Sequence, residues 1–487
     1  DAPLQIGYHW AMTENAPAVR RRRSGDRIIR RARLKPEHVF LEPARTSRPL
    51  PPPQFILASS FATLIAVGWL LLLLPVTAAP GQTTSALDAL FTATSAVCVT
   101  GLVVADTATH WSAFGQAVIL VLIQLGGLGF MTVSTLLFVL LGHRVTLRER
   151  LLMKEALGIG RLGDVTRLVL RIAAITFIIE AVGVVLLFLR FVTDMPPANA
   201  LWMSVFHAVS AFNNAGFDIF GRFESLAVYR NDAYVLLSIA ALIILGGISF
   251  TFVADVLRMR SFERLTLDSK LVLVSTVGLL LFGMAVFIII EPSNHRSLDS
   301  SGLAGQLLSS FFLSATARTA GFSTFDPILL ADQTLFFLMA LMFIGAASGS
   351  TGGGIKVNTF SVLSLAVWSA IIGRARTEAF GREVPQEQVL RALAVVFLSL
   401  ALVFVAALVL TLTESAEFLV LFFEATSAFG TVGLSAGVTP TLSDLGRLVI
   451  IFLMFIGRIG PLTLVLALGI RQKTMSYRYP VEEIKIG

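Results

Sequence analysis

The sequence is poor in charged residues, in histidine and above all in cysteine. Asp, Glu, Lys and Arg make up 14% of the 487 residues, against about 25% in a typical soluble domain. The single cysteine, Cys98, excludes a disulfide within the chain and a multi-cysteine metal site. The six histidines never stand at metal-ligand spacing. With 55% hydrophobic residues and a mean hydropathy of +0.80, the composition indicates an integral membrane protein.

Apolar runs alternate with charged loops. A hydrocarbon core of about 30 Å needs about 20 apolar residues in a helix. Eight segments meet this length, namely 55–76, 114–141, 168–192, 233–257, 271–290, 335–372 (interrupted), 392–412 and 447–468. Each pair of spans encloses a shorter apolar stretch that predicts a re-entrant half-helix; these are 85–97, 200–212, 302–317 and 417–429.

The distribution of Lys and Arg predicts the orientation. Loops 142–167, 258–270 and 373–391 are basic, whereas segment 77–112 contains no Lys or Arg. By the positive-inside rule, both termini are expected in the cytoplasm and the half-helices on the outer side. The net charge of +7 then reflects membrane topology and not a nucleic-acid partner. Residues 1–53, basic and proline-rich without a signal-peptide core, are expected to form a cytoplasmic tail.

Four glycines mark an internal repeat. Gly101, Gly216, Gly321 and Gly433 are 115, 105 and 112 positions apart, and a phenylalanine precedes each by ten residues. A small residue stands six positions before each glycine: Ser95, Ser210, Ala315 and Ser427. The chain therefore reads as four tandem units of span, half-helix, glycine loop and span. The expected segments are tail 1–53, pore repeats 54–145, 146–262, 263–376 (broken second span) and 377–470, and cytoplasmic tail 471–487.

The glycine loops suit a cation pore. Non-helical backbone at membrane depth is tolerated only where it is buried or lines water. Four loops around one axis can present carbonyl oxygens that replace the hydration shell of an ion, and glycine permits the positive φ that this requires. No acidic residue lies in the loop cores, which favours a large monovalent cation over calcium. The alternative, glycines that serve helix packing, would place them inside the spans.

The sixth span is interrupted by a glycine-rich segment. Its glycines and polar residues are Gly345, Ser348, Gly349, Ser350, Thr351, Gly352, Gly353, Gly354 and Lys356. Each glycine in a helix interior costs about 1 kcal/mol relative to alanine, so the helix should break here and border a permeation path. A phosphate-binding loop would need Gly-Lys-Ser/Thr after a strand. A serine protease would need a base for Ser348, and the late spans contain no histidine.

Two charged residues, Arg458 and Glu180, lie near the middle of predicted spans. A charge at mid-span, such as Arg458, costs at least about 2.5–3.5 kcal/mol and usually faces a cavity or a partner. The alternative is an arginine that extends toward a nearby interface. Glu180, in the third span, is either a cation contact or a helix-interface residue, and the sequence does not discriminate between them.

Through these loops, the broken span and Arg458, the sequence resembles the Trk/Ktr/HKT superfamily of potassium transporters, most of all the KtrB type of membrane subunit. The resemblance implies an all-α membrane pore of eight spans with pseudo-fourfold symmetry. It implies a K⁺-binding selectivity filter built from Val99, Thr100, Gly101, Asn214, Ala215, Gly216, Thr319, Ala320, Gly321, Thr431, Val432 and Gly433. The segment from Gly345 to Lys356 would be an intramembrane gating loop and Arg458 a barrier beside it.

Further expectations follow from the same resemblance. Plant relatives with serine in place of the first glycine favour sodium, so Gly101 implies potassium. The chain would be a homodimer in the bacterial inner membrane, on a cytosolic RCK-type (KtrA-like) ring that binds ATP or ADP. It would need no cofactor, with K⁺ as the transported ion and Na⁺ as a coupling or activating ion.

Several alternatives stay open at this point. They include a TrkH-type subunit, a Na⁺-permeable relative, and the choice between channel-like and Na⁺-coupled transport. A transporter of organic solutes would show inverted repeats, whereas these repeats share one orientation. An intramembrane enzyme would need a facing nucleophile and base, and none is found in the sequence.

Overall fold

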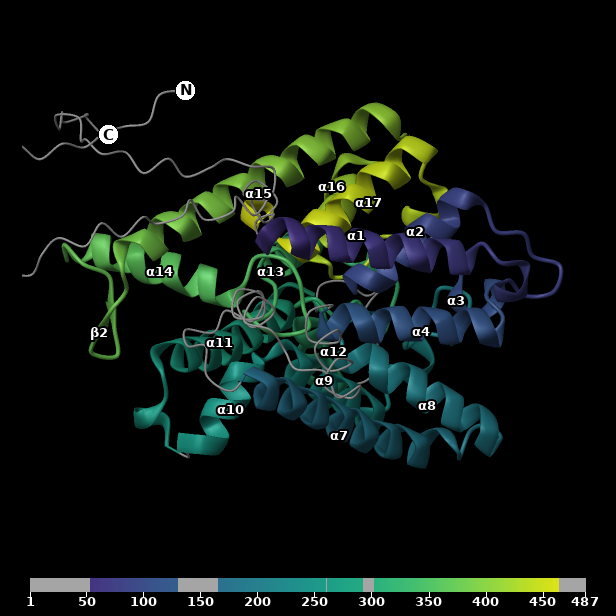
Figure 1. The fold of residues 1–487 in the computed structure, drawn as a ribbon, viewed down its shortest axis with the longest axis horizontal. Helices are drawn as coiled ribbons and strands as arrows, with labels where there is room; N and C mark the ends of the chain where they lie inside the picture. Colours follow the sequence, from purple (N-terminus) through teal and green to yellow (C-terminus); the bar gives the residue numbers. More distant parts are fainter. Residues whose placement is uncertain (1–52, 130–164, 260, 292–301, 464–487) are drawn as a thin grey trace, which may run out of the picture. The chain divides into compact units, whose positions relative to one another are not determined.

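The computed structural model describes residues 53–129, 165–259, 261–291 and 302–463, and it is almost entirely helical (Figure 1). Three helices recur in each quarter of the chain. They are α1 (Pro53–Leu72), α2 (Ala86–Cys98) and α4 (Ala113–Leu128); α7 (Val165–Phe191), α8 (Pro197–Phe212) and α9 (Ala233–Gly247); α11 (Leu267–Ile290), α12 (Gly302–Thr316) and α13 (Asp332–Phe343); α15 (Gln386–Thr413), α16 (Phe418–Gly430) and α17 (Asp444–Ile459).

Further elements connect these helices. They are α3 (Thr107–His110), α10 (Phe250–Met259), α14 (Val357–Ile371), a hairpin of β1 (Glu378–Ala379) and β2 (Arg382–Glu383), and the 3-10 turns η1 (Pro75–Thr77), η2 (Ala227–Tyr229), η3 (Phe262–Arg264), η5 (Pro327–Leu329) and η6 (Thr439–Thr441). The hairpin is a small departure from the all-α expectation. Its strands pair Glu378 with Glu383 and Ala379 with Arg382.

Four helices of the described residues are long and apolar enough to cross a membrane: Gln54–Leu72, Val169–Phe191, Leu267–Ile290 and Gln386–Thr413. The second long helix of each quarter is shorter, from 12 residues in α13 to 16 in α4 and α17. The predicted span 233–257 is bent: α9 and α10 meet at 90°, and the pair is a fifth candidate span if it crosses the membrane as one. Parts of the predicted spans 114–141 and 447–468 lie outside the described residues, so the count of eight stays a prediction.

The short helices α2, α8, α12 and α16 agree closely with the predicted half-helices. Helix α2 begins where the Ser85 hydroxyl accepts a hydrogen bond from the Asp88 amide, at 3.0 Å, which satisfies a free amide of the first turn. The phenylalanine ten residues before the glycine is fully buried in three quarters: Phe91, Phe206 and Phe423. In the third quarter Phe312, one residue later than expected, is buried instead.

Each second helix packs on the short helix of the next quarter. The contacts run from α4 to α8, from α9 to α12, from α13 to α16 and from α17 back to α2. The last contact carries an ion pair, 2.7 Å between Arg447 Nη1 and Asp88 Oδ1. The four quarters therefore close into a cycle, although the first and last are far apart in sequence.

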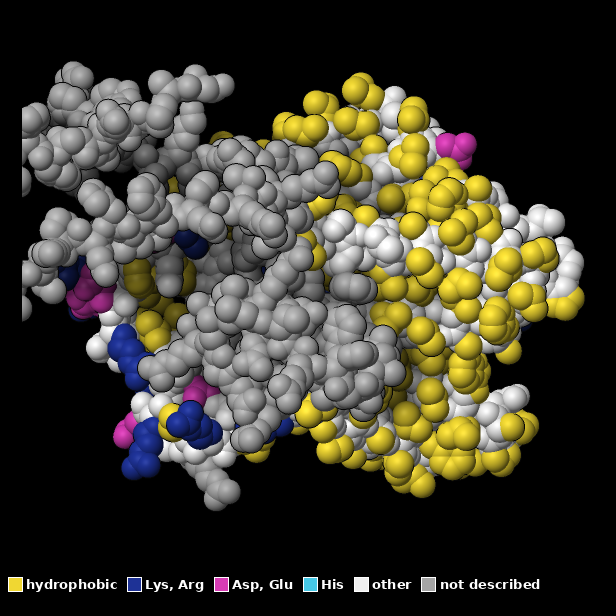
Figure 2. All heavy atoms as spheres, viewed as in Figure 1, with side chains coloured by type: hydrophobic (Ala, Val, Ile, Leu, Met, Phe, Trp, Pro, Cys, Tyr) yellow, Lys and Arg dark blue, Asp and Glu magenta, His cyan; other side chains and the backbone are white. Residues whose placement is uncertain are grey.

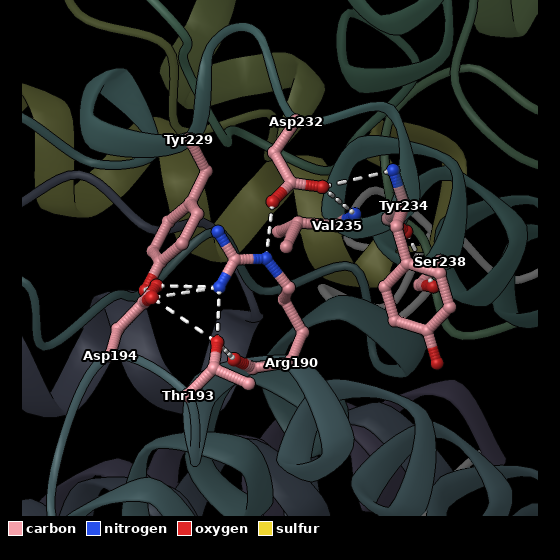
Figure 3. Close-up of polar contacts among 8 residues, drawn as sticks. All are labelled: Arg190, Thr193, Asp194, Tyr229, Asp232, Tyr234, Val235 and Ser238. Atoms are coloured by element: carbon pink, nitrogen blue, oxygen red, sulfur yellow. Dashed lines mark hydrogen bonds and ion pairs between the residues drawn. The ribbon is translucent and has the colours of Figure 1, made fainter.

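Polar contacts fix one end of the second quarter (Figure 3). Arg190, at the end of α7, lies 2.6 Å from Asp232, which caps α9, and 2.8 Å from Asp194. The Tyr229 hydroxyl donates to the same Asp194 carboxylate at 3.0 Å. The hydrogen bond from Arg190 holds the pKa of Asp194 below its usual range. Because these side chains are partly exposed, the network orients the helix ends more than it stabilises the fold.

Figure 2 shows hydrophobic side chains over much of the described surface in that view, with Lys and Arg gathered where Figure 1 places α10 and the β-hairpin. The exposed apolar residues include Phe397, Phe404 and Leu412 of α15, which are 74%, 65% and 79% exposed. Apolar surface of this extent on a long helix fits contact with lipid.

Candidate functional site: a ring of four glycine loops

The four predicted loops share an unusual backbone. In each, the residue two positions before the glycine adopts a left-handed conformation: Val99 (φ 58°), Asn214 (φ 58°), Thr319 (φ 76°) and Thr431 (φ 50°). The glycines follow with φ of 89°, 71°, 76° and 93°. A left-handed residue with a side chain is strained by about 1–2 kcal/mol, and such strain is concentrated at functional sites. Its recurrence at four equivalent positions argues for a shared role.

The loops meet in a closed ring. A Cβ atom added to Gly101 would overlap the carbonyl oxygen of Ala215, and one on Gly216 that of Ala320. The same relation holds from Gly321 to Val432 and from Gly433 back to Thr100. Each glycine thus accommodates the backbone carbonyl of the neighbouring loop. We call loops 99–101, 214–216, 319–321 and 431–433 the glycine ring.

Hydroxyl groups at the ends of the short helices support the ring. Ser95 and Ser427 accept hydrogen bonds from the amides of Gly101 and Gly433, at 3.1 and 3.2 Å. Ser210 instead donates to the carbonyl of Phe217 at 2.6 Å. In the third loop the sequence indicated Ala315, but Thr316 supplies the hydroxyl and donates to the Phe322 carbonyl at 2.7 Å.

A cavity of about 360 Å³ opens beside the glycines and is lined by all four of them. Its wall includes Asp218, Arg222, Glu224 and Asp326. Burial, together with the nearby charge of Asp106, raises the pKa of the Asp218 carboxyl to about 7. We call this space the mouth cavity. Asp218 was not identified as a site residue from the sequence, although it stands two residues after Gly216.

The predicted interruption between α13 and α14 is present, and we call residues 345–356 the interrupting loop. Its ends pair, with Ile344 bridged to Ile355. The loop touches the residues that precede the ring glycines. A Cβ on Gly352 would overlap the Thr319 hydroxyl, and one on Gly353 that of Thr431.

The interrupting loop is hydrogen-bonded to the ends of other helices. Thr351 donates to the Gly246 carbonyl through its amide at 3.2 Å and through its hydroxyl at 2.9 Å. The Ala347 amide donates to Gly247 and the Gly354 amide to Gly457, at 3.1 and 3.2 Å. The Lys356 ammonium donates back to the Gly352 carbonyl at 2.5 Å, which closes the loop on itself.

Arg458 joins the interrupting loop to α4. Its guanidinium donates to the carbonyls of Thr351 and Gly126, and to that of Gly127 at 3.3 Å. The Phe61 ring lies 5.9 Å from the guanidinium carbon. The structure therefore brings Arg458 together with the predicted gating residues, which lie against Thr319 and Thr431 of the glycine ring.

Three further glycines were not recognised from the sequence. Gly126, Gly246 and Gly457 stand where a Cβ would overlap the carbonyl of Val97, Phe212 or Phe429. Each of these carbonyls lies four residues before a ring glycine. A glycine that recurs 24 to 30 residues after each of these ring glycines was the available signal.

Among the described residues, no group of three or more His, Cys, Asp and Glu side chains could hold a metal ion. Cys98 is a free, buried thiol. Within this part of the chain, the groups suited to meet a cation at the ring are backbone carbonyls and hydroxyls.

Long apolar helices around a ring of backbone carbonyls define a helical membrane transport protein. The chain belongs to the TrkH cation transport protein family, whose model matches residues 54–477. This is a family of transporters and not an enzyme class. The match confirms the resemblance on which the sequence interpretation depended.

Close relatives support the same assignment. The chain is 41% identical over 451 residues to the potassium/sodium uptake protein NtpJ of Enterococcus hirae, covering 91% of this chain and 99% of NtpJ. It is 42% identical over 436 residues to the Ktr system potassium uptake protein B of Bacillus subtilis, covering 90% and 97%. The fold matches the crystal structure of the potassium transporter TrkH from Vibrio parahaemolyticus with a TM-score of 0.67 at 19% identity, covering 88% of this chain and 87% of that one.

Proposed function

We propose that this chain is the potassium-selective, ion-translocating subunit of a bacterial K⁺ uptake system. The observation that carries the proposal is the glycine ring, in which four loops present backbone carbonyls to one another. Carbonyl oxygens without carboxylates suit a weakly hydrated monovalent cation. Val99, Thr100, Asn214, Ala215, Thr319, Ala320, Thr431 and Val432, with the four glycines, are the proposed filter.

The pore has pseudo-fourfold symmetry and eight spans in this proposal. Its support is the cyclic packing of each second helix on the next short helix, together with the closed order of the ring. The interrupting loop and Arg458 form the gate and barrier beneath the filter. The basic residues beside α10 and the β-hairpin support a cytoplasmic position for that end.

The proposal also covers the oligomeric state, the regulatory partner and the role of Na⁺. The chain would act as a homodimer in the bacterial inner membrane, regulated by a cytosolic RCK-type ring that binds ATP or ADP and stimulated by Na⁺. The name of the Ktr relatives, which describes a system, supports a partner subunit. The name of NtpJ supports a second candidate function, uptake of both potassium and sodium.

Flux of Rb⁺ and Na⁺ into proteoliposomes, and growth of a bacterial strain that lacks K⁺ uptake, test the proposal. Rb⁺ flux that K⁺ blocks and excess Na⁺ does not, with growth restored at limiting K⁺, is the expected result. Equal flux of both ions would favour the second candidate. Absence of flux and of rescue in a correctly inserted protein would contradict both.

A further inference from the structure

We propose that Glu180 is a positioning residue for the second loop of the glycine ring, acting through a buried polar triad with Gln124 and Asn213. Discrimination of K⁺ from Na⁺ then depends on a carboxylate that never touches the ion. The inference rests on the proposed function, because it assigns what sets selectivity at that same ring.

The triad joins three helices behind the ring. Asn213, directly before the left-handed Asn214, donates through Nδ2 to a Glu180 carboxylate oxygen at 3.0 Å and to Gln124 Oε1 at 2.8 Å. Gln124 Nε2 lies 3.3 Å from the other Glu180 oxygen. Glu180 is 4% exposed and Asn213 fully buried. Glu180 lies in α7 and Gln124 in α4, and Asn213 directly follows α8, so the end of α8 is tied to two long helices.

Asn213 has little freedom to move. Its Nδ2, which carries two hydrogens, faces a third acceptor, the Val209 carbonyl at 2.9 Å. A Cβ on Gly127 would overlap Asn213 Oδ1, so α4 closes the other side of the amide. The position of Asn213 is thus set by groups outside its own loop.

The matching residue differs in each of the other loops. Cys98 is fully buried, Arg318 donates to the Thr276 carbonyl at 3.3 Å, and Gly430 packs against the Met342 carbonyl. The loop before Gly216 is the one whose matching residue a carboxylate holds. A carboxylate at membrane depth is costly and needs partners, and here both of its oxygens have them.

A shift of the second loop would reach its neighbours. The Ala215 carbonyl occupies the space beside Gly101, and Gly216 accommodates the Ala320 carbonyl. Sites of this kind need their geometry held within about 0.5 Å. Because Na⁺ and K⁺ differ in the oxygen distances that they require, loss of the Glu180 support should weaken discrimination before it stops flux.

The test compares Glu180→Ala, Glu180→Gln and Asn213→Ala in proteoliposomes, with Rb⁺ and Na⁺ flux measured on the same preparation. Glu180→Ala is expected to lower the Rb⁺ to Na⁺ flux ratio about tenfold, the effect of about 1.4 kcal/mol. Glu180→Gln keeps the size and one acceptor, so it should restore part of the ratio. The double variant Glu180→Ala/Asn213→Ala should be no worse than the larger single effect, because both substitutions break one network.

Leu187→Ala is the matched control, since Leu187 is a fully buried residue of α7 in the apolar core and carries no polar group that could join the triad. It should reduce thermal stability and leave the flux ratio unchanged. An unchanged ratio in a transporting Glu180→Ala protein, or equal changes in the control, would overturn the inference alone. If Glu180→Ala does not fold, the flux ratios of Glu180→Gln and Asn213→Ala test the inference instead. Wild-type Rb⁺ to Na⁺ ratios in both variants would overturn the inference. A wild-type protein without K⁺ selectivity would contradict the proposed function and this inference together.

Discussion

The glycine ring and the interrupting loop lie against each other but are held in different ways. Ring residues are held by close packing of each glycine against the backbone carbonyl of the neighbouring loop, and by hydroxyl groups at the ends of their own short helices. The interrupting loop is held mainly by hydrogen bonds to other parts of the chain: to Gly246 and Gly247 of α9, to Gly457 of α17, and through Arg458. Close packing resists small displacements, whereas hydrogen bonds can be exchanged for water at modest net cost.

The difference separates two tasks. A ring that cannot deform is suited to choose between ions, and a loop latched by exchangeable bonds is suited to open and close. Substitutions in the ring should therefore change selectivity or abolish flux. Substitutions that remove the hydrogen bonds holding the interrupting loop, which we call the latch, should raise flux and leave selectivity intact.

The largest effect is expected from Gly216→Ala. The new Cβ would meet the Ala320 carbonyl and the Gly321 backbone, at a φ of 71° that alanine disfavours. We expect K⁺-blockable Rb⁺ flux in proteoliposomes to fall about a hundredfold or more, a loss of about 2.7 kcal/mol or more. Gly278→Ala is the control, because a Cβ there meets nothing within 4 Å. Normal flux in Gly216→Ala would contradict a rigid ring.

Arg458→Ala should have the next largest effect, in the opposite direction. It removes a charge and the hydrogen bonds to the carbonyls of Thr351, Gly126 and Gly127. We expect Rb⁺ flux to rise about tenfold, because bonds from a charged donor contribute about 1.5–3 kcal/mol. Arg391→Ala, which breaks an exposed ion pair with Glu387, should leave flux unchanged. Unchanged or lower flux in Arg458→Ala would count against a barrier.

Thr351→Val should open the same latch more weakly. The hydroxyl bonds to the carbonyls of Gly246 and Phe212, 2.9 and 3.2 Å long, are lost while the side-chain size and the amide bond remain. Flux should rise about fivefold, the effect of about 1 kcal/mol, with the Rb⁺ to Na⁺ ratio unchanged. Thr411→Val, at an exposed helix position, is the matched control. A changed ratio would show that latch and ring are not separable.

The smallest effect concerns the mouth cavity and pH. With a pKa of about 7, Asp218 is neutral below pH 7 and negative above it, and a negative mouth concentrates cations. The KM for Rb⁺ should therefore fall about threefold between pH 6 and pH 8, the size of a screened interaction of about 0.6 kcal/mol. Asp218→Asn should keep the higher KM at both pH values. A variant that retains the wild-type pH profile would exclude Asp218 as its source.

The glycine loops and short helices could be predicted because their signals are local. A glycine and a short apolar run that ends just before it are visible in the sequence of each repeat, and glycine is the residue that adopts positive φ most easily. The hydroxyl that supports the third loop could not be predicted, because Thr316, one residue after the expected Ala315, supplies it while Thr319 and Gly321 keep their predicted places in the ring. Phe312 in place of Phe311 shows the same one-residue shift.

The bend between α9 and α10 and the partners of Glu180 could not be predicted, because they depend on contacts between distant segments. The run 233–257 is continuously apolar, and its bend after Gly247 coincides with hydrogen bonds between the Ala347 amide and Gly247 and between the Phe250 amide and Gly349. The partners of Glu180 lie 33 and 56 residues away in the sequence. Neither separation matches the period of a helix or a strand, so a single sequence gives no sign of these contacts.

The hydrogen bonds that hold the interrupting loop have a consequence for the current through a single pore. Its hydrogen bonds reach α9 and α17, and Arg458 of α17, which donates to the Thr351 carbonyl of the loop, also donates to the Gly126 carbonyl of α4. Releasing one of these contacts therefore moves backbone that the others still hold. Bonds that share a short, rigid segment tend to break together. We therefore expect electrical recordings from one pore to switch between two current levels, with dwell times that shorten in Arg458→Ala and with few intermediate levels.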